Sequence, residues 1–246
     1  MRALACVLFA SACGRVGFDA LAARDGAGDA AADTTPTGTV TWVKVFVGQA
    51  VTTGTLTDTW TVAAAHAGDA VVIHVFCEST AAPTAYSITA SGWTFTPLSP
   101  ITGPAGGFYA ASAGAIAPDT AATAFAVTWS GTASCTFVDE LGDEFTGNDP
   151  AGGSVTFGAH AQVAAGTGDC TAALTTPDTN DALWAACTTN CVSAVGPGFT
   201  KGADDAHCDW SEHRSSTDAA GTPETVTFAT TAQTSYVMTA ATIKPR

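Results

Sequence analysis

The sequence predicts an all-β protein: a single antiparallel, jelly-roll-like β-sandwich over residues 39–246, preceded by two N-terminal segments of different character. Three observations support this fold class. Apolar and polar residues alternate along many short segments, as in strands with one buried face. Clusters of Gly, Pro, Asn and Asp separate these segments, as turns do. No stretch of ten or more residues carries the apolar stripe of a helix.

Residues 1–12 have the pattern of a secretory signal peptide. Arg2 is the only charged residue, and the apolar stretch from Ala3 to Ala12 is too short to span a bilayer, which takes about 20 residues. Ala10 and Ala12 fit an ordinary small-x-small cleavage site. The run Ala10-Ser11-Ala12-Cys13 also resembles a lipobox, with Ala10 where Leu is usual, so two cleavage routes remain open.

The residues that follow favour lipidation of Cys13. They read Cys13-Gly14-Arg15-Val16-Gly17-Phe18-Asp19. This start resembles that of many predicted lipoproteins of myxobacteria and their relatives. The resemblance implies a lipid anchor in the membrane, and Gly14 after the cysteine implies the outer membrane, at its periplasmic or surface face. The alternative is an ordinary cysteine in a cleaved secreted protein.

Residues 13–38 are expected to form a flexible tether. They are rich in Ala, Gly, Asp and Thr and have almost no large apolar residue after Leu21, so they cannot bury enough surface to offset their ordering entropy. A coil of this length reaches roughly 25–30 Å, which would hold a domain clear of the lipid headgroups.

The remaining chain supplies the strands. In residues 56–62, Leu56, Trp60 and Val62 share one face and threonines the other, and residues 125–129 alternate in the same way. Residues 71–77 are apolar on both faces, which predicts a central buried strand. Further strands are expected at 41–47, 87–97, 107–115, 135–146, 182–188, 208–215, 224–230 and 235–243.

Charge and cysteine content indicate the compartment. The formal net charge of −14 repels phosphate backbones, so nucleic acid is excluded as a partner, whereas a cation such as calcium suits this surface. With Cys6 lost in the signal and Cys13 lipidated, six cysteines remain and predict three disulfides in an exported chain. We expect Cys77–Cys135 between strands, and pairing among the other four: Cys170, Cys187, Cys191 and Cys208.

A second resemblance spans nearly the whole strand region. The segments that carry it are Ala67-Gly68-Asp69-Ala70-Val71-Val72, Gly92-Trp93-Thr94, Phe108-Tyr109-Ala110, Ala126-Val127-Thr128-Trp129-Ser130-Gly131, Glu144-Phe145-Thr146-Gly147-Asn148-Asp149-Pro150, Asp181-Ala182-Leu183-Trp184 and Val237-Met238-Thr239-Ala240. In this order they resemble a β-sandwich domain of exported bacterial proteins that has no assigned activity. The resemblance implies the fold and leaves the function open.

The densest polar cluster lies at residues 204–213. Its candidate metal ligands are Asp204, Asp205, His207, Asp209, Glu212 and His213. They could bind calcium through oxygens or zinc through the histidines, but neither a calcium-loop nor a zinc-peptidase spacing is present. A solvated loop with Cys208 in a disulfide is the favoured interpretation. A zinc site of Cys187, Cys191, His207 and Cys208 is likewise less economical than disulfides.

Four acids fall within ten residues: Asp139, Glu140, Asp143 and Glu144. Same-face pairs along a strand would be about 13 Å apart, too far for a glycosidase acid and base without a partner from another strand. We therefore expect solvated or ion-paired carboxylates at an edge or turn. A hydrolase would need Glu140 or Glu144 to lie close to Glu212.

Among histidines and tryptophans, His74 is expected to be hydrogen-bonded in the core, and Trp60 and Trp129 to pack there. Trp93 and Trp210 lie beside turns and are the candidates for an exposed sugar-stacking platform.

Three functions remain open. The leading one is a non-catalytic surface binding or adhesion module, with polysaccharide as a candidate ligand. The others are a structural or assembly lipoprotein that binds an envelope protein, and a carboxylate-based hydrolase. No catalytic residue or cofactor is assigned, apart from a weakly supported calcium, because no nucleophile elbow, phosphate loop or dinucleotide motif is present.

Overall fold

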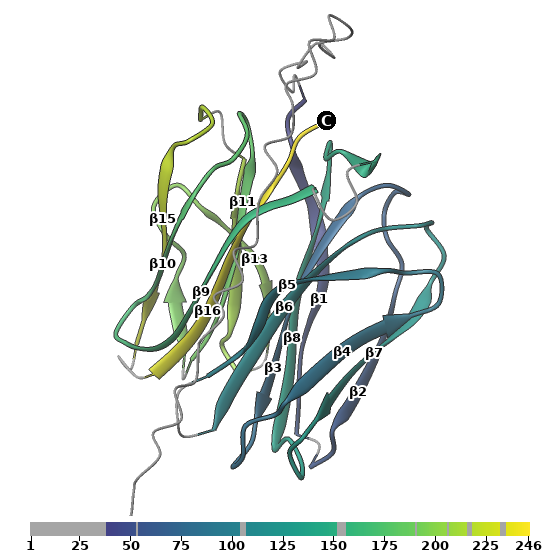
Figure 1. The fold of residues 1–246 in the computed structure, drawn as a ribbon, viewed down its shortest axis with the longest axis vertical. Coiled ribbons are helices and arrows are strands. Elements are labelled where there is room, and N and C mark those ends of the chain that lie inside the picture. The colour runs from purple at the N-terminus through teal and green to yellow at the C-terminus, as the bar shows by residue number, and fades with distance from the viewer. Residues whose placement is uncertain are drawn as a thin grey trace, which may run out of the picture. The chain divides into compact units, whose positions relative to one another are not determined.

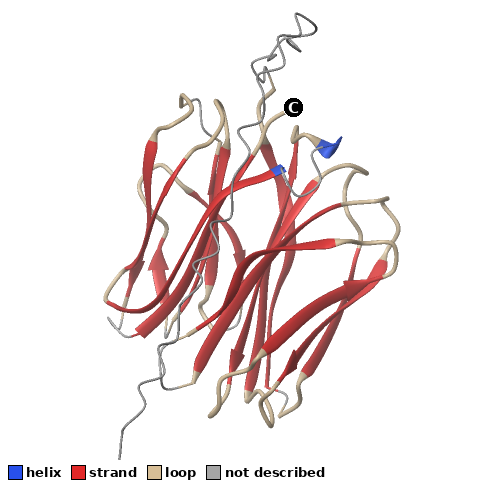
Figure 2. Cartoon of the chain, viewed as in Figure 1, coloured by secondary structure: helices blue, strands red, loops and turns tan. Residues whose placement is uncertain are grey.

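A computed structural model describes residues 38–52, 54–103, 107–151, 156–189, 191–205, 207–215, 218–231 and 235–246. The expected signal peptide, Cys13 and almost all of the tether lie outside these residues. The predicted all-β antiparallel sandwich fold is confirmed, and Figure 2 shows strands joined by loops almost throughout. No helix in this part of the chain is long and apolar enough to cross a membrane.

The described residues form sixteen strands, eight in each half of the chain. The first half contains β1 Thr41–Thr52, β2 Thr57–Val62, β3 Ala70–Glu78, β4 Ala85–Ala90, β5 Phe95–Thr102, β6 Phe108–Ile116, β7 Thr123–Ser130 and β8 Phe137–Thr146. The second half contains β9 Phe157–Thr167, β10 Cys170–Thr175, β11 Ala182–Thr188, β12 Val192–Ala194, β13 Thr200–Asp204, β14 Trp210–Arg214, β15 Pro223–Thr230 and β16 Ser235–Ile243.

The two halves have the same topology, strand for strand. The first forms a five-stranded sheet, β1-β8-β3-β6-β5, and a three-stranded sheet, β2-β7-β4. The second forms β9-β16-β11-β14-β13 and β10-β15-β12, which is the same order with every strand number raised by eight. Each half is thus a jelly-roll-like sandwich. Figure 1 shows the purple-to-teal first sandwich beside the green-to-yellow second one.

Three apolar clusters hold four sheets in a stack. Along β3, Val71 and Ile73 pack toward β2-β7-β4 in the core of the first sandwich. On the opposite face of the same strand, Ala70 and Val72 pack against Trp184 of β11, so the two five-stranded sheets bury each other. A third cluster fills the second sandwich. The prediction that residues 71–77 are buried on both faces is therefore correct, because β3 lies in an inner layer of the stack.

Two short sequence similarities between the halves accompany the repeated topology. Gly68-Asp69-Ala70 leads into β3 and Asn180-Asp181-Ala182 into β11, with left-handed φ values of 90° at Gly68 and 63° at Asn180. Gly and Asn are the residues that most readily adopt this conformation. Val127-Thr128-Trp129 in β7 likewise matches Val226-Thr227-Phe228 in β15, with both outer members of each triplet buried.

The sequence underestimated the number of strands. The predicted strand 87–97 is two strands, β4 and β5, separated by a turn with a left-handed Gly92. Strands β9, β10, β12 and β13 were not predicted as such, because residues 157–175 contain few large apolar side chains and β12 and β13 are short. All four belong to the second sandwich, so a single sandwich was expected where two are stacked.

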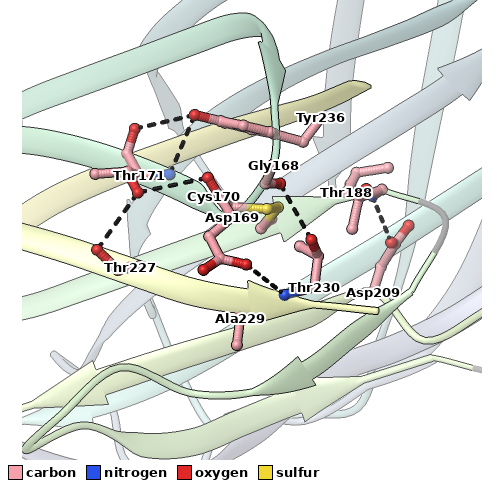
Figure 3. The surroundings of a disulfide bond; sticks show 12 residues. Gly168, Asp169, Cys170, Thr171, Thr188, Asp209, Thr227, Ala229, Thr230 and Tyr236 are labelled. Atoms are coloured by element: carbon pink, nitrogen blue, oxygen red, sulfur yellow. Dashed lines mark hydrogen bonds between the residues drawn. A yellow bond between two sulfur atoms is a disulfide. The ribbon is translucent and has the colours of Figure 1, made fainter. Parts of the chain in front are cut away.

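Two of the three expected disulfides are present. Cys77–Cys135 is confirmed, and Cys170–Cys187 joins β10 to β11 across the two sheets of the second sandwich (Figure 3). Cys191 and Cys208 are not joined, although Val192 N–H donates to Cys208 O at 3.0 Å and the two thiols are in hydrogen-bond contact. Disulfides of this kind are compatible with an exported, non-cytoplasmic protein.

Candidate functional site

A cavity of about 300 Å³ lies where the two sandwiches meet. We call it the seam pocket. It is lined by Phe76, Glu78, Phe108, Phe137, Asp139, Thr188, Thr189, His207 and Asp209. These residues come from both halves of the chain, so the pocket exists only because the sandwiches are stacked. Small-molecule sites commonly occupy such junctions.

Strand alternation explains which side chains reach the pocket. Phe76 of β3 is paired with Asp139 of β8, so both project from the same face toward the second sandwich. Phe76 packs against Phe108 with ring centroids 5.8 Å apart. Phe137 contacts the edge of the His207 ring at 4.8 Å. The result is an aromatic wall beside a polar floor.

Three carboxylates meet at this floor. Asp139 comes from β8, and Asp205 and Asp209 come from the loop between β13 and β14; one carboxylate oxygen of each lies within 4.8 Å of the others. Asp209 Oδ1 accepts a hydrogen bond from Thr189 N–H at 2.8 Å, at the end of β11 where Figure 3 shows Asp209 beside Thr188. Asp205 Oδ1 accepts from the backbone N–H of His207 at 2.8 Å.

Two oxygens of this cluster have no hydrogen-bond partner in the described structure. They are Oδ1 of Asp139 and Oδ2 of Asp205, both buried. His207 Nδ1 lies 3.4 Å from Asp139 Oδ1 and is the one cationic group in a described ion pair with the three acids. Buried oxygens without donors are uncommon in native proteins and call for an explanation.

Burial and crowding make these acids hard to ionise. Burial, followed by the charge of Asp205, raises the pKa of Asp139 to about 7, although His207 and Asp209 partly oppose the rise. Burial followed by the charges of Asp205 and Asp139 raises the pKa of Asp209. Burial likewise raises the pKa of Asp205. The cluster therefore favours the uptake of positive charge, as protons or as a cation.

The expectation that the four acids of residues 139–144 are solvated is wrong. Asp139 is 3% exposed, and Glu140, Asp143 and Glu144 are fully buried. The reason is that β8 is not an edge strand: it lies between β1 and β3, in a sheet that is covered on both faces. The ion-pairing part of that expectation holds for Glu144, whose Oε2 lies 3.6 Å from Lys44 Nζ.

Asp143 does not line the pocket. Its hydrogen bonds link the two sandwiches. It accepts hydrogen bonds from Trp42 Nε1 at 2.9 Å, from Trp184 Nε1 at 2.8 Å and from the Ser211 hydroxyl. These donors come from β1, β11 and β14. Three donors satisfy the buried carboxylate and fix the position of one five-stranded sheet on the other.

The carboxylates proposed for a hydrolase are not brought together. Glu140 and Glu144 face the β2-β7-β4 sheet, where they lie near Gln49 and Ala65 respectively. Glu212 faces the opposite side of the stack and accepts a hydrogen bond from Gly196 N–H at 2.7 Å. Two five-stranded sheets separate these faces.

The fold places the predicted metal ligands of residues 204–213 in different surroundings. His207 and Asp209 line the seam pocket and Asp205 lies beside Asp209, whereas exposed Asp204 pairs with Lys201 at 2.6 Å. Strand alternation turns Glu212 away, and the His213 ring stacks on Trp42 at 4.8 Å. A zinc site that includes Cys187 is excluded, since Cys187 is bonded to Cys170.

The aromatic platform predicted from tryptophans is not formed. Trp93 is only 9% exposed and packs against Phe125 at 5.0 Å, because the Gly92 turn folds it back into the first core. Trp210 is half-buried, with Lys201 Nζ 3.8 Å from its ring centroid. Trp60 and Trp129 pack in the core as expected. His74 is hydrogen-bonded to Ser112 and Thr188, and burial lowers its pKa to about 3.

Sequence reasoning missed Asp139 as the partner of Asp205 and Asp209, and it missed the phenylalanine wall. Asp139 had been noted, but nothing local indicates which loop of the second half will cover it. The repeated Asp-Ala before β3 and β11 and the Val-Thr-aromatic triplets of β7 and β15 were the signals that could have revealed two stacked sandwiches. No protein-family model, no curated protein and no solved structure matches this chain.

Proposed function

We propose that this protein is an exported envelope lipoprotein whose β-domain is a binding module, and that the seam pocket takes a sugar unit of a polysaccharide. The observation that carries the proposal is the pairing in one pocket of an aromatic wall, Phe76, Phe108 and Phe137, with buried oxygen acceptors on Asp139 and Asp209. This combination of apolar lining and few convergent polar groups is typical of ligand sites.

The chemistry of a sugar fits both surfaces. The C–H face of a sugar ring packs on phenyl rings, while its hydroxyls donate to carboxylates and exchange hydrogen bonds with Thr188 and Thr189. A volume of about 300 Å³ lies at the lower end of the range for small-ligand pockets. It suits a terminal or single protruding unit better than a long polymer segment.

The anchoring part of the proposal is supported by the lipobox-like Cys13, by the composition of residues 13–38 and by disulfides that fit an oxidising compartment. In a bacterial host, Cys13→Ala should move the protein from the membrane to the soluble fraction, and mass spectrometry of the wild-type N-terminus should show acyl chains on Cys13. A soluble wild-type protein with an unmodified Cys13 would contradict the anchor.

Binding is tested with the detergent-solubilised full-length protein on immobilised envelope polysaccharide fragments. We expect saturable binding that Phe108→Ala weakens at least about fivefold, because truncating a buried aromatic contact in a binding site often costs more than ~1 kcal/mol. Tyr109→Ala is the matched control: Tyr109 is the next residue of β6, equally half-buried, and faces the other side of the sheet. Equal effects of both variants, or no saturable binding, would contradict the proposal.

The three clustered carboxylates suit the binding of positive charge better than glycoside hydrolysis. The carboxylate oxygens of Asp139, Asp205 and Asp209 lie within 4.8 Å of one another. Retaining enzymes hold their two carboxyl groups roughly 5–5.5 Å apart and inverting enzymes roughly 6.5–9.5 Å apart. Carboxylates gathered this closely are better suited to share a positive charge. Release of reducing sugar during the binding assay would instead support a hydrolase function.

A further inference from the structure

The floor of the seam pocket contains buried carboxylate oxygens that have no hydrogen-bond donor in the described structure. Asp139 is 97% buried, lines the pocket and has an Oδ1 atom without a hydrogen-bond donor. Oδ2 of Asp205, a partly buried residue, also has no hydrogen-bond donor. Both carboxylates, together with that of Asp209, present an oxygen to a common point, with no pair of these atoms more than 4.8 Å apart.

The surrounding charges do not neutralise this cluster. Lys201 is paired with Asp204, and Lys44 with Glu144 on the other face of β8. His207 alone among the described cationic groups is ion-paired with the cluster, and its side chain is 39% exposed. Three carboxylates face one partly solvated imidazole, so their full ionisation would leave an excess of negative charge unless a cation is bound.

The second sandwich shows that the fold does not require an acid at this position. Asp139 is paired with Phe76 of β3, and the equivalent pair in the second sandwich is Val237 with Thr188 of β11. Val237 is fully buried and contributes to the apolar base of the same region. A strand in this place is therefore built equally well with valine, and the carboxylate of Asp139 is an added feature.

We propose that Asp139, Asp205 and Asp209 together bind one hard divalent cation of the calcium class at the floor of the seam pocket. Carboxylate oxygens are the ligands that such cations prefer. The atoms that the cluster brings together are oxygens, which suit a hard cation better than a soft, thiolate-preferring metal. Three carboxylates leave further coordination positions for water or for ligand hydroxyls.

The cation extends the proposed function of the pocket. Asp139 and Asp209 line the same pocket as the aromatic wall, so hydroxyls of a sugar in the pocket could replace water on the cation. That role in recognition rests on the proposed function, whereas the binding of the cation alone does not.

Cation binding is tested by titrating the full-length, chelator-treated protein with Ca²⁺ in a calorimeter and by following its thermal unfolding. We expect one saturable Ca²⁺ site and a Tm that rises with Ca²⁺, since a cation that binds only the folded state stabilises it. Asp139→Asn and Asp205→Asn should each weaken binding at least about tenfold, because even the loss of an outer-shell partner of a metal costs roughly 10–100-fold.

Asp204→Asn is the matched control. Asp204 is an exposed carboxylate in the same segment, directly before Asp205, and it should leave Ca²⁺ binding unchanged. The asparagine variants keep the shape of the side chain, and unfolding curves recorded in chelator show whether they remain folded.

No saturable heat and no Tm shift with millimolar Ca²⁺, or equal binding by wild type and folded Asp139→Asn, would overturn the cation site. The polysaccharide assay repeated in chelator separates the two ideas. Ca²⁺ binding without any polysaccharide binding keeps the cation site and overturns the proposed function. Polysaccharide binding that survives both chelator and Asp139→Asn keeps the binding module and overturns the cation's role in recognition.

Discussion

The central strands β8 and β16 occupy the same place in two sandwiches of identical topology, but their side chains differ in kind. Strand β8 carries Asp139, Glu140, Asp143 and Glu144 in the interior. At the positions of β16 with equivalent ladder partners stand Val237, Met238, Ala241 and Thr242. Both strands are buried along nearly their whole length.

This difference shows which kinds of side chain the fold requires in this strand and which are additional to it. Apolar residues and threonine close the second sandwich at little electrostatic cost, whereas buried carboxylates must be neutralised or supplied with donors. Asp143 receives three donors and locks the sandwiches together, Glu144 is ion-paired with Lys44, and Asp139 has only the partly exposed His207 as a described ion-pair partner. Strand β16 thus shows which side chains this place in the sandwich accepts without buried acids, and β8 can be compared with it.

The largest expected effect comes from the contact between the sandwiches. Trp184 of β11 is fully buried, and its Nε1 donates to Asp143. Trp184→Ala should lower the free energy of unfolding by about 3–5 kcal/mol, since it leaves a cavity and removes a donor from a buried carboxylate. Val72→Ala, at the equivalent position of β3, should cost less. Denaturant unfolding measures the loss of unfolding free energy in both variants. Equal losses would show that Trp184 contributes no more to the contact between the sandwiches than Val72 does.

The second sandwich should also gain from a third disulfide. Cys191 and Cys208 have thiols in contact, and the chain between them is as long as that between Cys170 and Cys187. In oxidised glutathione, the two thiols should lose two protons and two electrons to the glutathione disulfide and form a bond. A loop of this length predicts a stabilisation of about 3 kcal/mol. Peptide mapping with alkylation checks it; two alkylated cysteines at 191 and 208 after oxidation would contradict it.

The acids of β8 should make stability depend on pH. Burial raises the pKa of Glu140 to about 8, from an ordinary value of 4.5. Between these values the folded state keeps a proton that the unfolded state has lost, so stability falls as the pH rises, by at most about 1.4 kcal/mol per pH unit for this group. Unfolding curves at pH 5 and pH 8 measure the fall.

Replacing Glu140 with the residue at the equivalent position of β16 sharpens this test. Glu140→Met should flatten the decline between pH 5 and pH 8 and raise stability at pH 8. Asp119→Asn, in an exposed loop, should leave the wild-type slope unchanged. An unaltered slope in Glu140→Met would mean that other groups cause the pH dependence.

The smallest expected effect concerns the entries to β3 and β11. Asn180 has a φ of 63° where the first sandwich has Gly68 at 90°. Asn180→Gly should change stability by less than about 0.5 kcal/mol, while Asn180→Val should cost about 1–2 kcal/mol, because a β-branched residue is strained in this conformation. Thermal unfolding compares the two, and equal stability would argue against a structural equivalence of the two turns.

Several parts of the fold could be predicted from sequence because their signals are local. Alternation in residues 56–62 and the doubly apolar run 71–77 identified strands and the burial of β3. The Cys77–Cys135 pair was also predicted, as a link between two expected strands, although Cys135 lies just before β8. Strands β9 and β10 escaped notice because alanine, glycine and threonine give little contrast between faces.

The site was predicted only in part, for a different reason. The sequence placed Asp205, His207 and Asp209 in one cluster, since they are neighbours in the chain. It also grouped Glu212 and His213 with them, although alternation along β14 turns Glu212 to the other face. Trp93 was a candidate for exposure because it lies beside a turn, yet that turn directs it into the core.

By itself the sequence determined the all-β class, most strand positions, the signal-like start and the cysteine content suited to export. These depend on residue periodicity and composition within short windows. The tertiary structure alone decided that two sandwiches stack, that β8 lies in an inner layer and that Asp139 meets Asp205 and Asp209. The physical reason is that burial of a strand's second face depends on which distant sheet covers it, and no local pattern encodes that partner.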